Sequence, residues 1–327
     1  MKSKFLSCVP VIILAACSTF ADPVKLIFDT DIGNDVDDVL ALGMLNVLQS
    51  RGACQLLAVT VTKCDEDAGP FVDAIDTFYG HTNIPIGCIR GAPEEPTKFL
   101  SLVETKDGDQ WRYPHRLMRS SDAPDPLRVI RSVLSQAPDG SVELVQVGYF
   151  SNFAALLDSE ADKDLVKQKV RLLSIMGGCF QTVDDNNHFC EFNVIKNVQA
   201  AQRLAHDWPT PIVWSGYEIG VAIPYPAVSI ERDYAYAAHH PLKDAYVAYN
   251  PPPHERPTWD LTAALYAVFP DRGYFGLSTA GSVSIGPDGF TYFTPKSDGR
   301  DHFLKVDGVQ ASRAREAFVQ LCSQLSK

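Results

Sequence analysis

The chain has 327 residues, of which 46% are hydrophobic and 21% charged, and its formal net charge at pH 7 is −11. A chain of this length and composition can bury one large core, and no charged linker or repeat of roughly 20–50 residues divides it. The acidic balance argues against nucleic acids and anionic membranes as partners.

Residues 1–21 have the composition of a secretory signal. Two lysines precede a short apolar run, and small residues follow it. The run is too short to span a bilayer as a mature helix. Residues 14–17, Leu-Ala-Ala-Cys, also resemble a bacterial lipobox, which would make Cys17 the lipidated N-terminus, and cleavage after Ala21 is the alternative. We therefore expect an exported protein, periplasmic, extracellular or lipid-anchored, whose single folded domain is residues 22–327.

An aspartate-rich turn follows the first expected strand. Residues 24–28 form an apolar run of β-branched and aromatic side chains, which predicts a strand that is buried on both faces. Gly33 and Asn34 tolerate the positive φ that a tight turn requires. From Val39 onward the residues are good helix formers, so three of the aspartates lie at or just before a helix N-terminus. The aspartates of this stretch are Asp29, Asp31, Asp35, Asp37 and Asp38.

This crowding of carboxylates points to a bound cation. A helix N-terminus stabilises a nearby carboxylate by only about 0.3–1 kcal/mol, too little to offset so many like charges. Crowded carboxylates raise one another's pKa unless a cation neutralises them, and Ca²⁺ or Mg²⁺ prefers such oxygen ligands. A solvated acidic loop is the alternative, but a turn at the carboxyl end of a buried strand is the usual ligand position in open α/β sheets.

The same stretch resembles the signature of a known family. The string DTDIGNDVDD followed by VLAL is similar to the nucleoside hydrolases that prefer inosine, uridine or purine ribosides, which have an Asp-x-Asp-x-Gly turn and then a paired Asp-Asp at a helix start. The commoner family spacing puts the pair two residues nearer the glycine. Either Asp35 or Asp37 can therefore take the role of the first Asp of the pair, and the Ala-Leu that follows favours Asp37 and Asp38.

A second strand is expected over residues 54–62, about one helix length after the first, which suggests a βαβ unit and a parallel sheet. It runs into a polar turn at residues 63–67. The resemblance implies that this turn can supply a ribose contact, which makes Asp65 a candidate, and an exposed loop is the alternative. A helix over residues 69–79 and a strand over residues 84–88 are predicted next.

Residues 91–125 are polar, rich in proline and charge, and have no clear period, which is typical of a long surface loop. Such loops in α/β enzymes often cover the substrate. Trp111, Tyr113 and His115 could stack on a base or protonate it, and packing within the loop is the alternative.

Two strands that end in glycine turns follow a predicted helix at residues 127–137. The strand at residues 142–147 leads into a segment that resembles the family's strand-Gly-x-x-[Ser/Thr]-Asn pattern, in which the residue before the glycine gives its main-chain carbonyl to calcium. The resemblance therefore implies a carbonyl ligand at Val147. The strand at residues 170–176 ends in a family-like Met-Gly-Gly, whose glycines let the backbone approach a ligand. Met176 would lie under the sugar.

Glu191-Phe192-Asn193 resembles the family's Glu-Phe-Asn, in which the Glu and the Asn bind ribose hydroxyls. In an extended segment, alternation puts Glu191 and Asn193 on one face with Phe192 turned away. The resemblance also implies an upstream asparagine on the 5′ side of the sugar, which is either Asn186 or Asn187. A plain turn is the alternative for this run.

Six cysteines follow the leader, an even number that permits disulfides in an oxidising compartment, although sequence does not determine their pairing. A bridge between Cys179 and Cys190 would fix the loop between them. No Cys-x-x-Cys pair is present, which argues against structural zinc.

Residues 257–265 resemble the family's late motif, an Asp at a helix N-terminus that is the last calcium ligand, here Asp260. Many relatives have a histidine before it as leaving-group acid, and purine-preferring relatives have a tryptophan that activates the base by stacking. Trp259 stands at this place; its indole N–H is not acidic, but its ring is a flat apolar platform. A core residue is the alternative. The remaining elements are predicted at residues 197–206 (helix), 211–215 (strand), 273–307 (hairpin at the sheet edge) and 310–325 (helix).

The resemblance implies one α/β domain with a mostly parallel central sheet flanked by helices, nucleoside hydrolase-like and Rossmann-like, and a homo-oligomer by analogy. Ca²⁺ would be held by Asp31, Asp38, Asp260 and the Val147 carbonyl, with Asp31 as the general base. A ribonucleoside would be held by its ribose at Asp37, Glu191 and Asn193, and the products would be ribose and the free base. No protein partner beyond further copies of the chain is implied.

Two other classes compete with this hypothesis. A non-catalytic nucleoside- or ribose-binding lipoprotein would use the same residues. A phosphatase of the haloacid dehalogenase type also has Asp-x-Asp after a strand, but its threonine or valine two residues after the second Asp is Gly33 here.

Overall fold

The computed structural model describes residues 22–91 and 98–324. The predicted leader and the lipobox at Cys17 lie outside these residues. None of the helices in the described ranges is long and apolar enough to cross a membrane.

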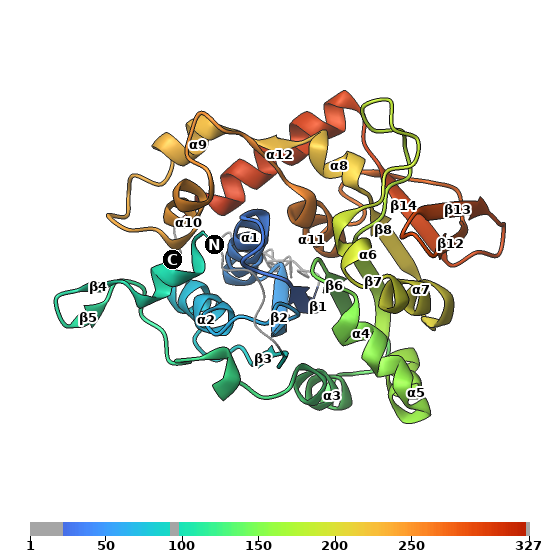
Figure 1. Ribbon diagram of the computed structural model, residues 1–327, viewed down its shortest axis with the longest axis horizontal. Coiled ribbons are helices and arrows are strands. Elements are labelled where there is room, and N and C mark those ends of the chain that lie inside the picture. The colour runs from blue at the N-terminus through green and yellow to red at the C-terminus, as the bar shows by residue number, and fades with distance from the viewer. Residues whose placement is uncertain (1–21, 92–97, 325–327) are drawn as a thin grey trace, which may run out of the picture.

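The centre of the fold is one mixed sheet that is mostly parallel (Figure 1), with the strand order β13-β12-β14-β8-β7-β6-β1-β2-β3 and β11 paired to β14. The run from β14 to β3 is parallel, and β12 and β13 form an antiparallel hairpin at one edge. The predicted fold class is therefore confirmed. The strands are β1 (Val24–Thr30), β2 (Cys54–Val61), β3 (Ile86–Cys88), β6 (Val142–Gln146), β7 (Val170–Met176), β8 (Ile212–Ser215), β11 (Gly276–Leu277), β12 (Gly281–Ile285), β13 (Thr291–Pro295) and β14 (Asp301–Lys305).

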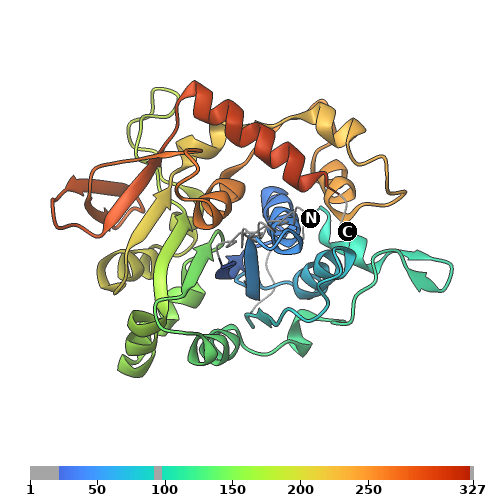
Figure 2. The ribbon, with the colours of Figure 1, turned by 180° about the vertical axis from the view of Figure 1, so that it is seen from behind.

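Helices cover both faces of the sheet. On one face, α1, α2, α10, α11 and α12 enclose one hydrophobic cluster, and Figure 2 shows α12 running along this side. On the other face, α3, α4, α5 and α7 enclose a second cluster. The helices are α1 (Asp37–Ser50), α2 (Ala68–Phe78), α3 (Pro126–Gln136), α4 (Ser151–Ala155), α5 (Glu160–Lys169), α6 (Phe192–Lys196), α7 (Val198–Asp207), α8 (Tyr217–Val221), α9 (Ala227–Arg232), α10 (Pro241–Tyr249), α11 (Trp259–Val268) and α12 (Gly308–Cys322).

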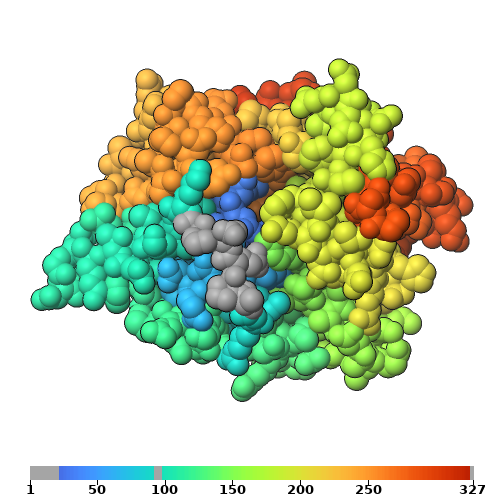
Figure 3. Space-filling view, in the orientation of Figure 1, coloured from blue at the N-terminus to red at the C-terminus, as the bar shows by residue number. Residues whose placement is uncertain are grey.

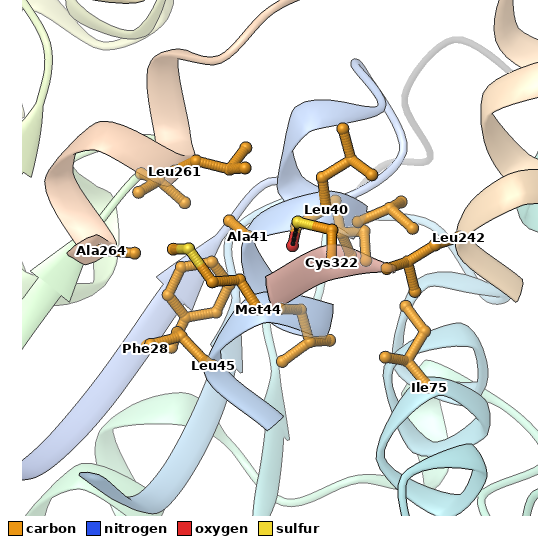
Figure 4. Close-up of a cluster of buried hydrophobic side chains, with 14 of the residues drawn as sticks. Phe28, Leu40, Ala41, Met44, Leu45, Ile75, Leu242, Leu261, Ala264 and Cys322 are labelled. Atoms are coloured by element: carbon orange, nitrogen blue, oxygen red, sulfur yellow. Dashed lines mark hydrogen bonds between the residues drawn. The ribbon is translucent and has the colours of Figure 1, made fainter. Parts of the chain in front are cut away.

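Helix α1 is buried on all sides, as its continuous apolar sequence requires. Its residues from Asp37 to Leu48 are all buried, and it packs against α11, α12 and β2. Figure 4 shows its side chains meeting β1, α2 and α11, with Leu40, Ala41, Met44 and Leu45 among those labelled. Burying a large apolar side chain is worth roughly 1.5–3 kcal/mol. The acidic first turn of α1 is therefore fixed to the core.

Most strands and helices predicted between residues 24 and 215 are found within one or two residues of their expected ends. The predicted hairpin segment 273–307 contains β11 to β14, with the hairpin itself at residues 281–295, and the last helix ends at Cys322 instead of at residue 325. The prediction of an extended conformation at residues 191–193 is wrong, because Glu191 caps the short helix α6. No disulfide is present among the described residues, so Cys179 and Cys190 do not form the predicted bridge. Four further two-residue strands form two small sheets apart from the central one: β4 (Lys106–Asp107) with β5 (Gln110–Trp111), and β9 (Pro224–Tyr225) with β10 (Arg256–Pro257).

Candidate functional site

A cavity of about 340 Å³ opens beside the carboxyl ends of β1, β6 and β7. Small-molecule sites usually have volumes of roughly 300–1,000 Å³. In Figure 3 the blue atoms of the N-terminal part are visible between the orange and the yellow-green segments. The cavity is lined by Asp31, Asn34, Asp35, Asp37, Asp38, Val147, Met176, Glu191, Phe192, Asn193, Tyr217, Tyr249, Arg256, Trp259 and Asp260.

Three buried carboxylates from the two ends of the chain meet in this cavity. Asp37 and Asp38 open α1, Asp260 lies in the first turn of α11, and one oxygen from each lies within 4.8 Å of the other two. We call these residues the acid triad. The main-chain N–H of Asp260 donates to Asp37 Oδ2 at 3.2 Å, and the Thr30 hydroxyl donates to Asp38. Two helix N-termini therefore face the triad, which favours negative charge there.

Burial raises the pKa of every member of the acid triad well above its usual range, and charge repulsion adds to the effect. The largest repulsion comes from Asp35 for Asp37, from Asp31 for Asp38, and from Asp37 for Asp260. Without a cation, burial and repulsion therefore favour the protonated form of these carboxyl groups. An all-oxygen donor set of this kind fits a hard divalent cation such as Ca²⁺.

Asp31 lies in the same cavity, outside the tight triad, and is held by a chain of hydrogen bonds. Asn34 Nδ2 donates to Asp31 Oδ2 at 2.6 Å and to the Tyr149 hydroxyl at 2.7 Å, and Lys63 Nζ donates to Asn34 Oδ1 at 2.8 Å. Burial raises the pKa of Asp31 to about 7, despite the hydrogen bond from Asn34 and the charge of Lys63. Sequence reasoning missed Asn34 as an orienting group, and it missed the buried Lys63 altogether.

Glu191 and Asn193 reach the cavity through a helix cap. The Glu191 carboxylate accepts from the main-chain N–H groups of Asn193, Val194 and Gly178 at 2.9, 3.1 and 3.2 Å. Burial raises the pKa of Glu191 to about 7 even so. Because Glu191 begins a helix, Phe192 is not turned away as predicted but lines the cavity with 47% of its surface exposed.

The Val147 carbonyl, the predicted main-chain ligand, also faces the cavity. It accepts a hydrogen bond from Asn193 Nδ2 at 2.7 Å, and the same amide nitrogen lies 3.3 Å from Met176 Sδ. A carbonyl oxygen has two lone pairs, so this contact leaves one for a further partner.

Three predicted ribose contacts lie away from the cavity. The loop of Asn186 and Asn187 folds back on itself through paired main-chain hydrogen bonds between Val183 and Asn186, and His188 stacks on Phe290 with ring centroids 4.1 Å apart. Asn187 lines a different cavity beside β13. The Asp65 carboxylate accepts from the main-chain N–H of Asp67 at 2.9 Å in its own turn.

The three aromatic residues predicted in the long loop also make contacts within the protein and not in the cavity. Tyr113 is buried and its hydroxyl donates to Asp244. Trp111 lies beside His115, with ring centroids 5.0 Å apart, and Lys106 Nζ lies 4.1 Å from the Trp111 ring. None of the three aromatic residues is among those that line the cavity, so the packing alternative applies.

Asp35 and Asp37, the two alternatives for one role, have different partners. Asp37 belongs to the acid triad, whereas Asp35 accepts from Nε of Arg256 at 2.9 Å and from its Nη2. The Arg256 guanidinium also lies over the rings of Tyr249 and Trp259, at 5.1 and 4.9 Å from their centroids. No sequence motif marked Arg256.

Trp259 forms part of an aromatic wall. Its indole N–H donates to the Tyr217 main-chain carbonyl at 2.8 Å, and the two rings lie 5.4 Å apart. Tyr217 in turn contacts Phe189 at 4.2 Å between centroids. The cavity thus has an acidic part and an aromatic part, which fits a ligand with a hydroxyl-rich half and a flat half.

The chain is similar to a known family in sequence and to known proteins in structure. A sequence model described as inosine-uridine preferring nucleoside hydrolase matches residues 26–310. No curated protein matches the chain. Similar solved structures include a purine-preferring ribonucleoside hydrolase from Gardnerella vaginalis (18% identity, TM-score 0.71, covering 93% of this chain and 99% of that one) and an inosine-uridine preferring nucleoside hydrolase from Bacillus anthracis (19%, 0.69, 91% and 99%). Another is the type III effector protein XopQ complexed with adenosine diphosphate ribose (16%, 0.65, 92% and 94%). At these identities the structural likeness shows the fold.

Proposed function

This chain belongs to the inosine-uridine preferring nucleoside hydrolase family, and from that premise we propose a Ca²⁺-dependent, purine-preferring ribonucleoside hydrolase. The family consists of metal-dependent N-glycosidases, so the chain is an enzyme that acts on ribonucleosides. The observation that carries the proposal is the meeting of Asp31 and the acid triad in one cavity. Export, lipidation and assembly into homo-oligomers stay predictions.

The cation site is proposed at Asp38, Asp260 and Asp31 with the Val147 carbonyl. Asp38 and Asp260 belong to the triad, and the other two groups line the same cavity. Ca²⁺ bound here would supply the positive charge that keeps the carboxylates ionised, and it would lower the pKa of a water molecule and orient it.

Asp31 is the proposed general base. A water oxygen bonds to the anomeric carbon while the bond from that carbon to the base breaks, with inversion, and the bonding electron pair leaves with the base. Asp31 takes the proton that the water loses. Its hydrogen bond from Asn34 fixes the direction in which the carboxylate points.

Asp37, Glu191 and Asn193 are the proposed ribose contacts. Their side chains are buried and line the acidic part of the cavity. Carboxylates beside the sugar stabilise the positive charge that develops on the ring in the transition state, and hydroxyl contacts make ribose binding strict. Met176 contributes an apolar contact beneath the sugar.

The proposed purine preference depends on the aromatic wall. Trp259 and Tyr217 line the cavity with large rings, and a two-ring base gains more stacking area there than a pyrimidine does. Their side chains do not read the edge of the base, so discrimination between purines should be weak.

The test is a nucleoside panel with the purified protein of residues 22–327, in which released ribose is measured as reducing sugar. We expect ribose from inosine, adenosine and guanosine at higher kcat/KM than from uridine. Asp31→Asn should lower kcat about 10²–10⁴-fold because the general base is lost. Asp65→Asn, a matched acid outside the cavity, should change nothing. Tight nucleoside binding without ribose release, or phosphate release from a nucleoside monophosphate, would contradict the proposal.

A further inference from the structure

We propose that Arg256, clamped by Asp35, is a catalytic residue that stabilises the departing base by donating hydrogen bonds to it. This inference rests on the proposed function. It names a hydrogen-bond donor for the leaving group, which the loop residues Trp111, Tyr113 and His115 cannot supply because they do not line the cavity, and it gives Asp35 a role distinct from that of Asp37.

A further hydrogen-bond donor for the base is needed because several N–H donors in the cavity already have acceptors within the protein. The Trp259 indole N–H is used by the Tyr217 carbonyl at 2.8 Å. The Asn34 amide nitrogen donates to Asp31 and Tyr149, and the Asn193 amide nitrogen donates to Val147. None of these groups can donate a hydrogen bond to a base that gains negative charge unless it first breaks an existing hydrogen bond.

Arg256 has N–H groups that are not used in hydrogen bonds within the described residues. Asp35 accepts from Nε and Nη2, so both Nη1 hydrogens and one Nη2 hydrogen have no acceptor among the described residues. Within the described chain, Arg256 is also the one cationic side chain that lines the cavity. Tyr217 and Tyr249, which carry hydroxyl groups, also line the cavity, but a hydrogen bond from a charged donor such as a guanidinium stabilises a developing negative charge more than one from a hydroxyl does.

Arg256 is also fixed in the right part of the cavity. Its guanidinium lies 4.9 Å from the centroid of the Trp259 ring, the proposed platform for the base, and its side chain is 22% exposed. The main-chain N–H donates to the Tyr246 hydroxyl at 2.9 Å, and the residue pairs with Tyr225 in the β9–β10 ladder. A base that contacts Trp259 therefore lies next to a charge that is already oriented, which is the arrangement that favours transition-state stabilisation.

Asp35, which holds the Arg256 guanidinium, lies in the lengthened turn between Gly33 and the paired aspartates. Asp35 falls within the two extra residues between the glycine and the paired aspartates, and its carboxylate grips the guanidinium at two nitrogens instead of joining the acid triad. Bidentate pairing fixes the plane of the guanidinium, which a lysine at this position could not achieve.

The chemical balance is simple. The bond between the anomeric carbon and the base nitrogen breaks, and its electron pair stays on the base, which carries negative charge spread over its ring acceptors. Arg256 donates hydrogen bonds to those acceptors and keeps its protons, because a guanidinium does not deprotonate in proteins. The base then takes a proton from solvent water.

The test compares two substrates that differ in leaving group. Inosine needs help to expel its base, whereas p-nitrophenyl β-D-ribofuranoside releases a stable anion. We expect Arg256→Gln to lower kcat/KM for inosine about 10²–10³-fold, the usual effect of removing one oriented donor, and to leave the value for the p-nitrophenyl riboside unchanged. Asp35→Asn, which loosens the clamp but keeps Arg256, should show the same selectivity with a smaller loss. Arg272→Gln, an arginine that lies over Phe269 outside the cavity, is the matched control.

An equal loss on both substrates would overturn the inference, since it would mean that Arg256 supports the turn or the acids and not the leaving group. No loss with Arg256→Gln would also overturn it. Failure of the proposed function is distinguishable, because the unmodified protein would then cleave neither substrate.

Discussion

Asp31 owes its orientation to a buried lysine that contacts none of the reacting atoms in our proposal. Lys63, two residues after β2, donates to Asn34, and Asn34 donates to Asp31. Lys63 is 1% exposed, whereas Asn34 lines the cavity, so the chain of hydrogen bonds runs from the buried interior to the site. Lys63 is therefore a positioning residue for the general base.

We expect Lys63→Met to lower kcat for inosine by about 10-fold to 100-fold, the scale of loss when a catalytic group is misplaced by a fraction of an ångström to 1 Å. KM should change little, because the ribose contacts do not touch Lys63. Steady-state kinetics measures both values. Lys167→Met, on the exposed side of α5, is the control. An unchanged kcat would show that Asn34 orients Asp31 without Lys63.

At the residue scale, sequence located the acids but not their partners. Asp31, Asp37, Asp38 and Asp260 could be singled out because each stands beside a strand end or a helix start. The Asp35–Arg256 pair joins residues 221 positions apart, and no pattern in either segment points to the other. Long-range pairs of this kind are set by the fold and are not encoded in local composition.

At the scale of elements, the acid triad depends on how closely α8 approaches α11. A Cβ atom on Gly220 would lie 2.1 Å from Trp259 Cδ1, so only glycine lets the two helices pack as they do. The Gly220 carbonyl also accepts the main-chain N–H of Thr258 at 3.2 Å, just before α11. Gly220 thereby positions both the aromatic wall and the start of the helix that carries Asp260.

We expect Gly220→Ala to destabilise the protein by about 1–3 kcal/mol, the usual cost of overpacking a tight contact. It should also lower kcat/KM for purine nucleosides, since Trp259 must move. Thermal unfolding and steady-state kinetics measure the two effects. Gly308→Ala, where an added Cβ meets no neighbour within 4 Å, is the control. Wild-type stability in Gly220→Ala would mean that Trp259 can shift at no cost.

Helices and strands with a strong hydrophobic pattern were predicted well. A short helix whose formation depends on a capping side chain was not. The parallel strands and α1 have continuous apolar sequences that identify them. Helix α6 has five residues and exists because Glu191 caps it and also accepts from Gly178, a contact across 13 positions. The same cap brings Phe192 into the cavity, which alternation in a strand could not predict.

At the scale of the whole molecule, the fold gathers the acidic side chains beside the carboxyl ends of the central parallel strands, and their burial links stability to pH. Burial raises the pKa of Asp31 to about 7 and raises the pKa values of the triad well above their usual range. The unfolded chain ionises these groups near pH 4. Between about pH 4 and pH 7 the native state therefore binds more protons than the unfolded state, so its stability falls as pH rises. Ca²⁺ binds the ionised carboxylates, so its stabilising effect should grow over the same interval.

Thermal unfolding with chelator and with Ca²⁺, from pH 5 to pH 8, tests most directly whether these acids share one cation. We expect the melting temperature of the chelated protein to fall as pH rises, and Ca²⁺ to raise it most at pH 8. Asp260→Asn should remove most of the Ca²⁺ effect, and Asp65→Asn should keep it. A melting temperature that does not respond to Ca²⁺ at any pH, or a full response in Asp260→Asn, would contradict the shared site.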